Sequence, residues 1–151
     1  MKKRLYLLLT LLTISAFILA ACGSKANTES EQGVEPTEGE PVVPDQYKDL
    51  KNPFAGQSDA ADSGKKIYTE KCATCHGDGG KGDGPGGAAL NPKPEDLTVL
   101  AEDPDGMVYW RIAEGGVVSP FKEKGSAMPA WMNVLSQDEI WQVVTYVRTM
   151  K

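Results

Sequence analysis

The sequence predicts an all-α fold with long loops, and three observations support this fold class. Apolar residues recur at helical spacing over residues 108–112 and 140–147. No stretch alternates apolar and polar residues in the way that a half-buried strand does. Residues 77–87 contain seven glycines, which excludes regular structure there. We therefore expect about three to five helices connected by long, irregular segments.

Local signals place the individual helices along the chain. A short helix is expected to run into Cys72, because apolar residues lie four and five positions before it. Asp103-Pro104 predicts an N-cap and a first-turn proline for the next helix, which Gly115-Gly116 is expected to end. Residues 136–139 read Ser-Gln-Asp-Glu, a capping box that opens the last helix.

Composition excludes several classes of function. The chain of 151 residues has 21 acidic and 16 basic residues and a formal net charge of −5. It contains no basic run, so nucleic-acid binding is not expected. Three cysteines cannot form a disulfide framework, and a single histidine excludes a multi-histidine metal site.

The N-terminus has the pattern of a secretory signal. Lys2-Lys3-Arg4 precedes an apolar run over residues 5–21, as the charged and apolar regions of a signal peptide do. The run ends in Leu19-Ala20-Ala21-Cys22, which resembles the lipobox of bacterial lipoproteins. The resemblance implies cleavage before Cys22 and its acylation, with palmitate among the expected chains. The mature protein would then be lipid-anchored to the cell membrane on its extracytoplasmic face. The alternative is an uncleaved transmembrane helix, for which the run is at the short limit.

Residues 22–58 are expected to be a lipidated cysteine followed by a disordered acidic tether. From residue 23 the segment holds seven acids, four prolines and four glycines, and few large apolar side chains that could offset its ordering entropy. The globular domain is expected over residues 59–151. Five apolar residues leave its start open by several positions: Val42, Val43, Tyr47, Leu50 and Phe54.

The strongest motif is Cys72-Ala73-Thr74-Cys75-His76, the C-x-x-C-H signature of covalent c-type haem attachment. On a helix, positions i, i+3 and i+4 share one face, so both sulfurs and the imidazole point the same way. A thioredoxin-like pair would require a βαβ context that is lacking here. A closed zinc site would require four ligands. The motif therefore favours a haem.

His76 is the expected proximal ligand of the haem iron, and no second histidine is present. The sixth ligand is therefore a methionine, a weaker group or nothing. Met128 precedes a proline in a loop, and pre-proline residues favour extended backbone that could cross the second face of the ring. Met132 is the second candidate. Met107 and Met150 fall in predicted helices, where core packing is expected.

The order of these features resembles that of class I, mono-haem cytochromes c over residues 63–151. Gly64 and Tyr68 resemble the glycine and aromatic of the N-terminal helix in that family. Val143 and Tyr146 resemble their crossing partners on the C-terminal helix. The resemblance implies a small cytochrome c-like domain wrapped around one covalent haem c, and Met128-Pro129 is similar to the axial methionine motif.

Gly84-Pro85 resembles the family's Gly-Pro, whose proline carbonyl accepts a hydrogen bond from the proximal imidazole. Pro92 is the alternative if the loop is registered differently. Three further residues stay open between haem contact and ordinary packing: Trp110, Arg111 and Trp131.

The resemblance implies a single-electron carrier of a respiratory chain, without catalytic residues of its own. Two other functions stay open. One is a haem enzyme or gas sensor with an open or displaceable sixth site. The other is the electron-entry subunit of a larger redox complex. Expected partners are the membrane lipid and redox proteins, with the chain acting as a monomer or as a subunit of such a complex. The acidic domain could be steered by a basic partner face.

Overall fold

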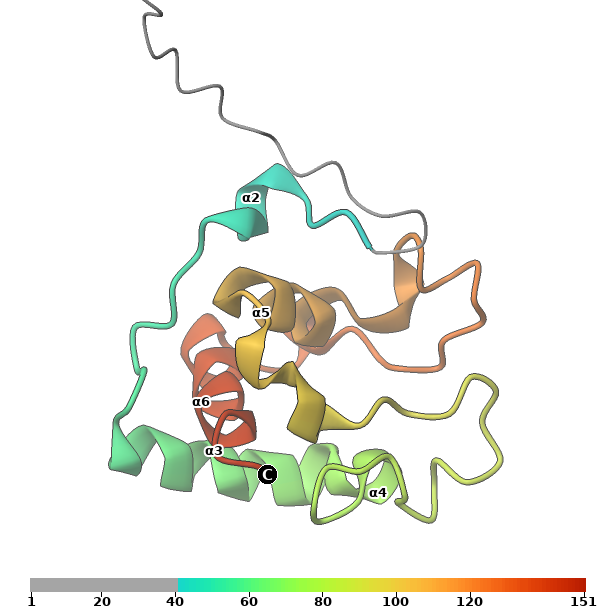
Figure 1. Ribbon diagram of the computed structural model, residues 1–151, viewed down its shortest axis with the longest axis horizontal. Coiled ribbons are helices and arrows are strands. Elements are labelled where there is room, and N and C mark those ends of the chain that lie inside the picture. The colour runs from blue at the N-terminus through green and yellow to red at the C-terminus, as the bar shows by residue number, and fades with distance from the viewer. Residues whose placement is uncertain (1–40) are drawn as a thin grey trace, which may run out of the picture. The chain divides into compact units, whose positions relative to one another are not determined.

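The computed structural model describes residues 41–151, which form helices and loops without a strand in that range. The α-helices are α2 (Asp45–Lys48), α3 (Ser58–Lys71), α4 (Ala73–His76), α5 (Asp105–Glu114) and α6 (Gln137–Val147). Short 3-10 helices are η1 (Leu97–Glu102), η2 (Gly115–Val117) and η3 (Trp131–Asn133). The all-α prediction is confirmed (Figure 1). The predicted signal peptide, Cys22 and the first part of the tether lie outside the described residues.

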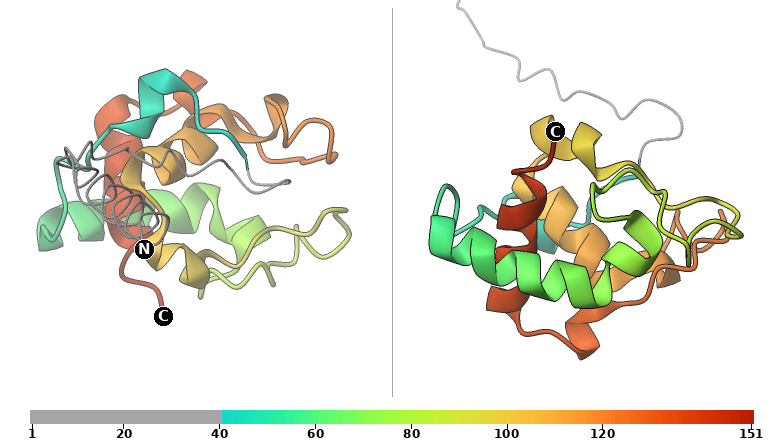
Figure 2. Two further views of the ribbon diagram at one scale, coloured as in Figure 1. Left: turned by 45° about the horizontal axis from the view of Figure 1, so that its top comes forward. Right: turned by 90° about the horizontal axis from the view of Figure 1, so that it is seen from below.

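Helix α3 crosses α6 at the point that the sequence predicts (Figure 2). A Cβ at Gly64 would overlap the backbone carbonyl of Gln142, so only glycine permits this approach of the two helices. One turn later the Tyr68 ring lies 5.3 Å from the Tyr146 ring, centroid to centroid. Tyr68 is buried, and its hydroxyl donates a hydrogen bond to the Gly77 carbonyl at 2.6 Å.

The predicted capping box of α6 is present. Ser136 Oγ accepts a hydrogen bond from the Glu139 backbone N–H at 3.3 Å, and the Glu139 carboxylate accepts one from the Ser136 N–H at 2.8 Å. The helix then buries Ile140, Val143 and Val144 completely. This apolar face packs on α3 and α5 and forms the centre of the core.

Helix α5 begins and ends close to the predicted positions. Pro104 precedes its first residue, but the Asp103 side chain does not cap it. Instead, a carboxylate oxygen of Asp103 lies 3.5 Å from the guanidinium of Arg111, near the end of the helix. Gly115 ends α5 with a positive φ of 59°, a conformation that favours glycine.

The segment before α3 differs from the expected disorder. Residues 44–57, here called the strap, run along α5 and α6 and include α2. Tyr47 and Asn52 are each only 8% exposed, and Asn52 Nδ2 donates to Thr145 Oγ1 of α6 at 2.9 Å. The ordered domain therefore starts before residue 59, because a few well-placed side chains offset the polar composition of the segment. Among residues 41–151 no helix is long and apolar enough to cross a bilayer.

Candidate haem site

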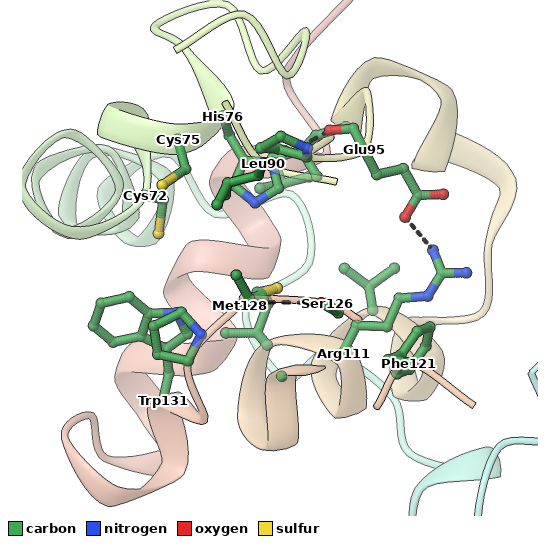
Figure 3. A pocket seen from close by; sticks show the side chains of 18 of the residues that line it. Cys72, Cys75, His76, Leu90, Glu95, Arg111, Phe121, Ser126, Met128 and Trp131 are labelled. Atoms are coloured by element: carbon green, nitrogen blue, oxygen red, sulfur yellow. Dashed lines mark hydrogen bonds and ion pairs between the residues drawn. The ribbon is translucent and has the colours of Figure 1, made fainter. Parts of the chain in front are cut away.

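One large pocket lies between the α3–α4 corner, α5 and the loops on either side of α5. Its volume is about 560 Å³, within the range of cofactor pockets. Figure 3 shows side chains that face it from opposite walls. Residues far apart in the sequence contribute to its lining: Cys72, Cys75, His76, Arg111, Met128 and Trp131.

The C-x-x-C-H motif forms one wall of this pocket. Cys72 ends α3, and the single turn of α4 carries Cys75 and His76. All three side chains line the pocket, and the two cysteines are not joined in a disulfide. Figure 3 shows both sulfurs along one edge, with the imidazole beyond them. Burial, with a smaller contribution from Cys75, raises the pKa of the Cys72 thiol to about 11, so this thiol is protonated at neutral pH.

The orientation of the His76 ring is set by a backbone carbonyl. His76 Nδ1 lies 3.2 Å from the carbonyl oxygen of Glu95. A carbonyl only accepts, so Nδ1 carries the proton and Nε2 keeps a free lone pair for a metal. Burial lowers the pKa of the imidazole and thereby favours the neutral form, which is the form that binds iron.

In the structure the carbonyl beside His76 Nδ1 is that of Glu95, and not that of Pro85 or Pro92, the two residues that the resemblance implies. Pro92 lines the pocket, whereas Pro85 is exposed and does not line it. The residue before Pro85 has a different contact. A Cβ at Gly84 would contact the carbonyls of Ala73 and Thr74, so Gly84 packs directly against α4. Gly84 thus supports α4, while the hydrogen bond to the imidazole comes from the later residue Glu95.

Two glycines at the end of α5 hold the methionine loop. The Gly116 N–H donates to the Met128 carbonyl at 2.8 Å. A Cβ at Gly115 would overlap the Pro129 carbonyl, so the loop lies directly on the helix end. Met128 consequently faces the pocket opposite His76 (Figure 3).

The other methionines are placed differently. Met132, the second candidate ligand, is 53% exposed and does not line the pocket. Met150 packs at the edge of the core, with its sulfur beside Gly80. Met107 is half-buried and also lies outside the pocket lining. Of the candidates along the chain, the structure thus brings only Met128 into the site.

Arg111 is a site residue that the sequence left open. Its guanidinium lies 3.0 Å from the Glu95 carboxylate and 5.8 Å from the centre of the Phe121 ring. Its Nε is buried and has no hydrogen-bond partner among residues 41–151. An unpaired donor in the wall of an apolar pocket fits a ligand that carries a carboxylate, as haem does with its propionates.

Trp110 and Trp131, which the sequence left open, lie in different parts of the structure. Trp131 lines the pocket. Trp110 is buried in the core, and its indole N–H donates to the Glu114 carboxylate at 3.0 Å. The helical position of Arg111, next to a buried stripe, is the one sequence signal that could have placed it at the pocket edge.

Comparison with known proteins identifies the family. The family model for cytochrome c matches residues 61–151, and the chain belongs to the cytochrome c family. The cofactor of this family is a covalently bound c-type haem, and the chain therefore carries one.

Similar proteins include subunits of redox complexes. The chain is 31% identical over 109 residues to the cbb3-type cytochrome c oxidase subunit FixP of Azorhizobium caulinodans. The aligned region covers 72% of this chain and 33% of FixP. It is 34% identical over 101 residues to the cytochrome c subunit of the quinone alcohol dehydrogenase of Gluconacetobacter polyoxogenes, covering 65% of this chain and 20% of that subunit. The chain thus spans a third or less of these two relatives.

A solved structure shares the fold. A chain of the reducing HAO-like protein complex of Kuenenia stuttgartiensis aligns with a TM-score of 0.54 and 31% identity. The alignment covers 68% of this chain and 47% of that one.

Proposed function

We propose that this cytochrome c is a single-electron carrier of a respiratory chain. One haem would be attached through Cys72 and Cys75, with His76 and Met128 as the two axial ligands of its iron. The observation that carries the proposal is the placement of His76 and Met128 on opposite walls of the same pocket, with both sulfurs at its edge.

The residues of the site have separate tasks in this function. The bound haem supplies an iron centre that takes up and releases one electron. The Glu95 carbonyl holds the His76 ring with Nε2 toward the pocket, which fixes the tautomer that a metal requires. A thioether ligand from Met128 would favour the ferrous form. With both axial positions filled, no position remains for a substrate, so the chain would transfer electrons without catalysis of its own.

The surface around the pocket suggests the chemistry of the redox partner. Three exposed lysines line the pocket, Lys71, Lys93 and Lys124, and no ion pair within residues 41–151 involves them. The one acid in the lining, Glu95, is paired with Arg111. The partner would therefore present an acidic face, in contrast to the basic face expected from the charge of the whole domain.

The membrane location is also part of the proposal. The N-terminal sequence supports a lipid anchor at Cys22 that holds the domain on the extracytoplasmic face of the cell membrane. Two acyl chains on one residue would give a stable anchor where a single chain would not. Labelled palmitate should be incorporated into the wild-type chain in its host, and Cys22→Ala should remove the label and release the protein into the soluble fraction.

A second candidate is the electron-entry subunit of a larger complex. The observation in its favour is that the similar FixP and alcohol dehydrogenase chains are named as subunits of such complexes. Stable co-purification of other chains from the native membrane would favour this role. A partner that dissociates in moderate salt would favour the carrier.

The visible spectrum of the reduced holoprotein, recorded with and without carbon monoxide, tests the ligation. A six-coordinate c-type spectrum that the gas does not change is expected for the wild type and for Met132→Ala. Met128→Ala should bind carbon monoxide readily. A wild-type chain that binds the gas as readily as Met128→Ala would rule out the methionine ligand and favour a ligand-binding haem.

A further inference from the structure

The strap, which precedes the residues matched by the cytochrome c family model, is bound to the helix that carries the methionine loop. Tyr47 is its main anchor. Its hydroxyl donates to Glu114 Oε1 at 2.6 Å, and its ring centre lies 6.0 Å from that of Tyr109. A Cβ at Gly106 would overlap the Tyr47 carbonyl, so the strap backbone lies directly on α5 (Figure 1).

Glu114 connects this anchor to the end of α5. It is the last residue of the helix, and its other carboxylate oxygen accepts the Trp110 indole N–H at 3.0 Å. A carboxylate at a helix C-terminus faces the negative end of the helix dipole. Two donors, one from the strap and one from the core, offset this unfavourable position and hold the side chain in place.

The residues that follow Glu114 hold the methionine loop. Gly115 lies against the Pro129 carbonyl, and the Gly116 N–H donates to the Met128 carbonyl at 2.8 Å. The path from the Tyr47 hydroxyl to the Met128 backbone therefore runs through one carboxylate and two adjacent glycines. At both glycines a Cβ would overlap atoms of the methionine loop, so the helix end and this loop are in direct contact.

We infer that Tyr47 is a positioning residue for Met128: its hydroxyl fixes the end of α5 through Glu114 and so keeps the methionine on the haem iron. The inference rests on the His/Met ligation proposed above. It assigns to the strap a role in the site as well as in stability. Without the hydroxyl, Glu114 Oε1 loses its partner, the carboxylate can turn to solvent, and the loop of Met128 loosens with the end of the helix.

The test compares two variants of the haem-loaded full chain. Tyr47→Phe removes the hydroxyl and keeps the ring on Tyr109. Asn52→Ala is the matched control, because Asn52 anchors the other end of the strap to Thr145 without touching the end of α5. The measurements are the long-wavelength absorption band of methionine-ligated ferric haem and the affinity for added imidazole, which competes with Met128 for the iron.

Tyr47→Phe should weaken the band and raise the imidazole affinity roughly three- to tenfold, where tenfold corresponds to about 1.4 kcal/mol. Asn52→Ala should lower the unfolding midpoint but leave both ligand measurements at wild-type values. Glu114→Gln should resemble Tyr47→Phe, because an amide has one oxygen acceptor where two donors are present.

Three outcomes would count against the inference. Wild-type band and imidazole affinity in Tyr47→Phe would overturn it while leaving the proposed ligation intact. Equal changes in Tyr47→Phe and Asn52→Ala would show that the strap acts only through overall stability. A wild-type chain without the methionine band would overturn the proposed ligation and the inference together.

Discussion

Glu95 holds His76 through its backbone carbonyl, at 3.2 Å from Nδ1, while its side chain binds Arg111 at 3.0 Å. One residue thus connects the expected iron ligand to the cation in the opposite wall of the pocket. The carbonyl fixes the ring, and the carboxylate neutralises a guanidinium whose Nε has no partner in the described part of the chain. The charge of the Glu95 side chain can therefore be changed without removing the hydrogen bond to His76.

We expect Glu95→Gln to raise the reduction potential of the haem. The substitution removes a negative charge beside the pocket and leaves Arg111 less neutralised, which disfavours the more positive ferric state. The Glu95 side chain is 53% exposed, so solvent screening keeps the shift small. Spectroelectrochemical titration measures it, with Glu70→Gln on the exposed surface of α3 as the control. A potential that falls, or that matches the control, would contradict this role of Glu95.

The exposed lysines of the pocket should govern electron transfer to small charged reagents. Oxidation of the ferrous protein by ferricyanide should slow as the ionic strength rises, although the chain carries a net charge of −5. The double variant Lys93→Gln/Lys124→Gln should show a weaker salt dependence. Lys65→Gln/Lys66→Gln, on α3 outside the pocket lining, is the matched control for net charge. Stopped-flow kinetics that change equally in both double variants would show that only total charge matters.

Gly64→Ala should destabilise the holoprotein by about 1–3 kcal/mol, the usual cost of overpacking. The new Cβ would overlap the Gln142 carbonyl, and neither backbone can move without separating α3 from α6. Gly79→Ala is the control, because a Cβ there has nothing within 4 Å. Denaturant unfolding measures both, and the control should stay within about 0.5 kcal/mol of the wild type. Equal stability of the two variants would mean that the helix crossing tolerates a methyl group.

Stability should fall as the pH rises above 10, in part because of Tyr47. Burial, with the Glu114 hydrogen bond, raises the pKa of the Tyr47 hydroxyl in the folded state from 10.0 to about 12. Between these values the unfolded chain has already released the proton that the folded chain still binds, so rising pH favours unfolding. The free energy of unfolding, measured from pH 8 to 11.5, should decrease less steeply in Tyr47→Phe than in the wild type. Parallel curves would show that other groups, such as the buried Tyr68, carry the alkaline transition.

Much of the site follows from local sequence rules. The spacing of Cys72 and His76 determines that three reactive side chains share one face, because that spacing is one turn of a helix. The capping box of α6 is local in the same way, and the structure confirms it. The placement of Met128 agrees with its position before a proline.

Other features depend on packing between distant segments. Glu95, 19 residues after His76, supplies the carbonyl that holds the imidazole, and Gly84 packs against α4. No local pattern encodes either contact. The strap is polar in composition and was expected to be disordered, yet Tyr47 and Asn52 find partners 67 and 93 residues away.

The sequence by itself determined the all-α class, the haem motif and the candidate methionines, because these depend on the periodicity and chemistry of neighbouring residues. Only the tertiary structure decided which methionine faces His76, which carbonyl holds the imidazole and which sign of charge surrounds the pocket. Each of these depends on loops whose course is set by contacts across the fold. The residues next to a carbonyl or a lysine in the sequence do not indicate where in the fold that group will lie.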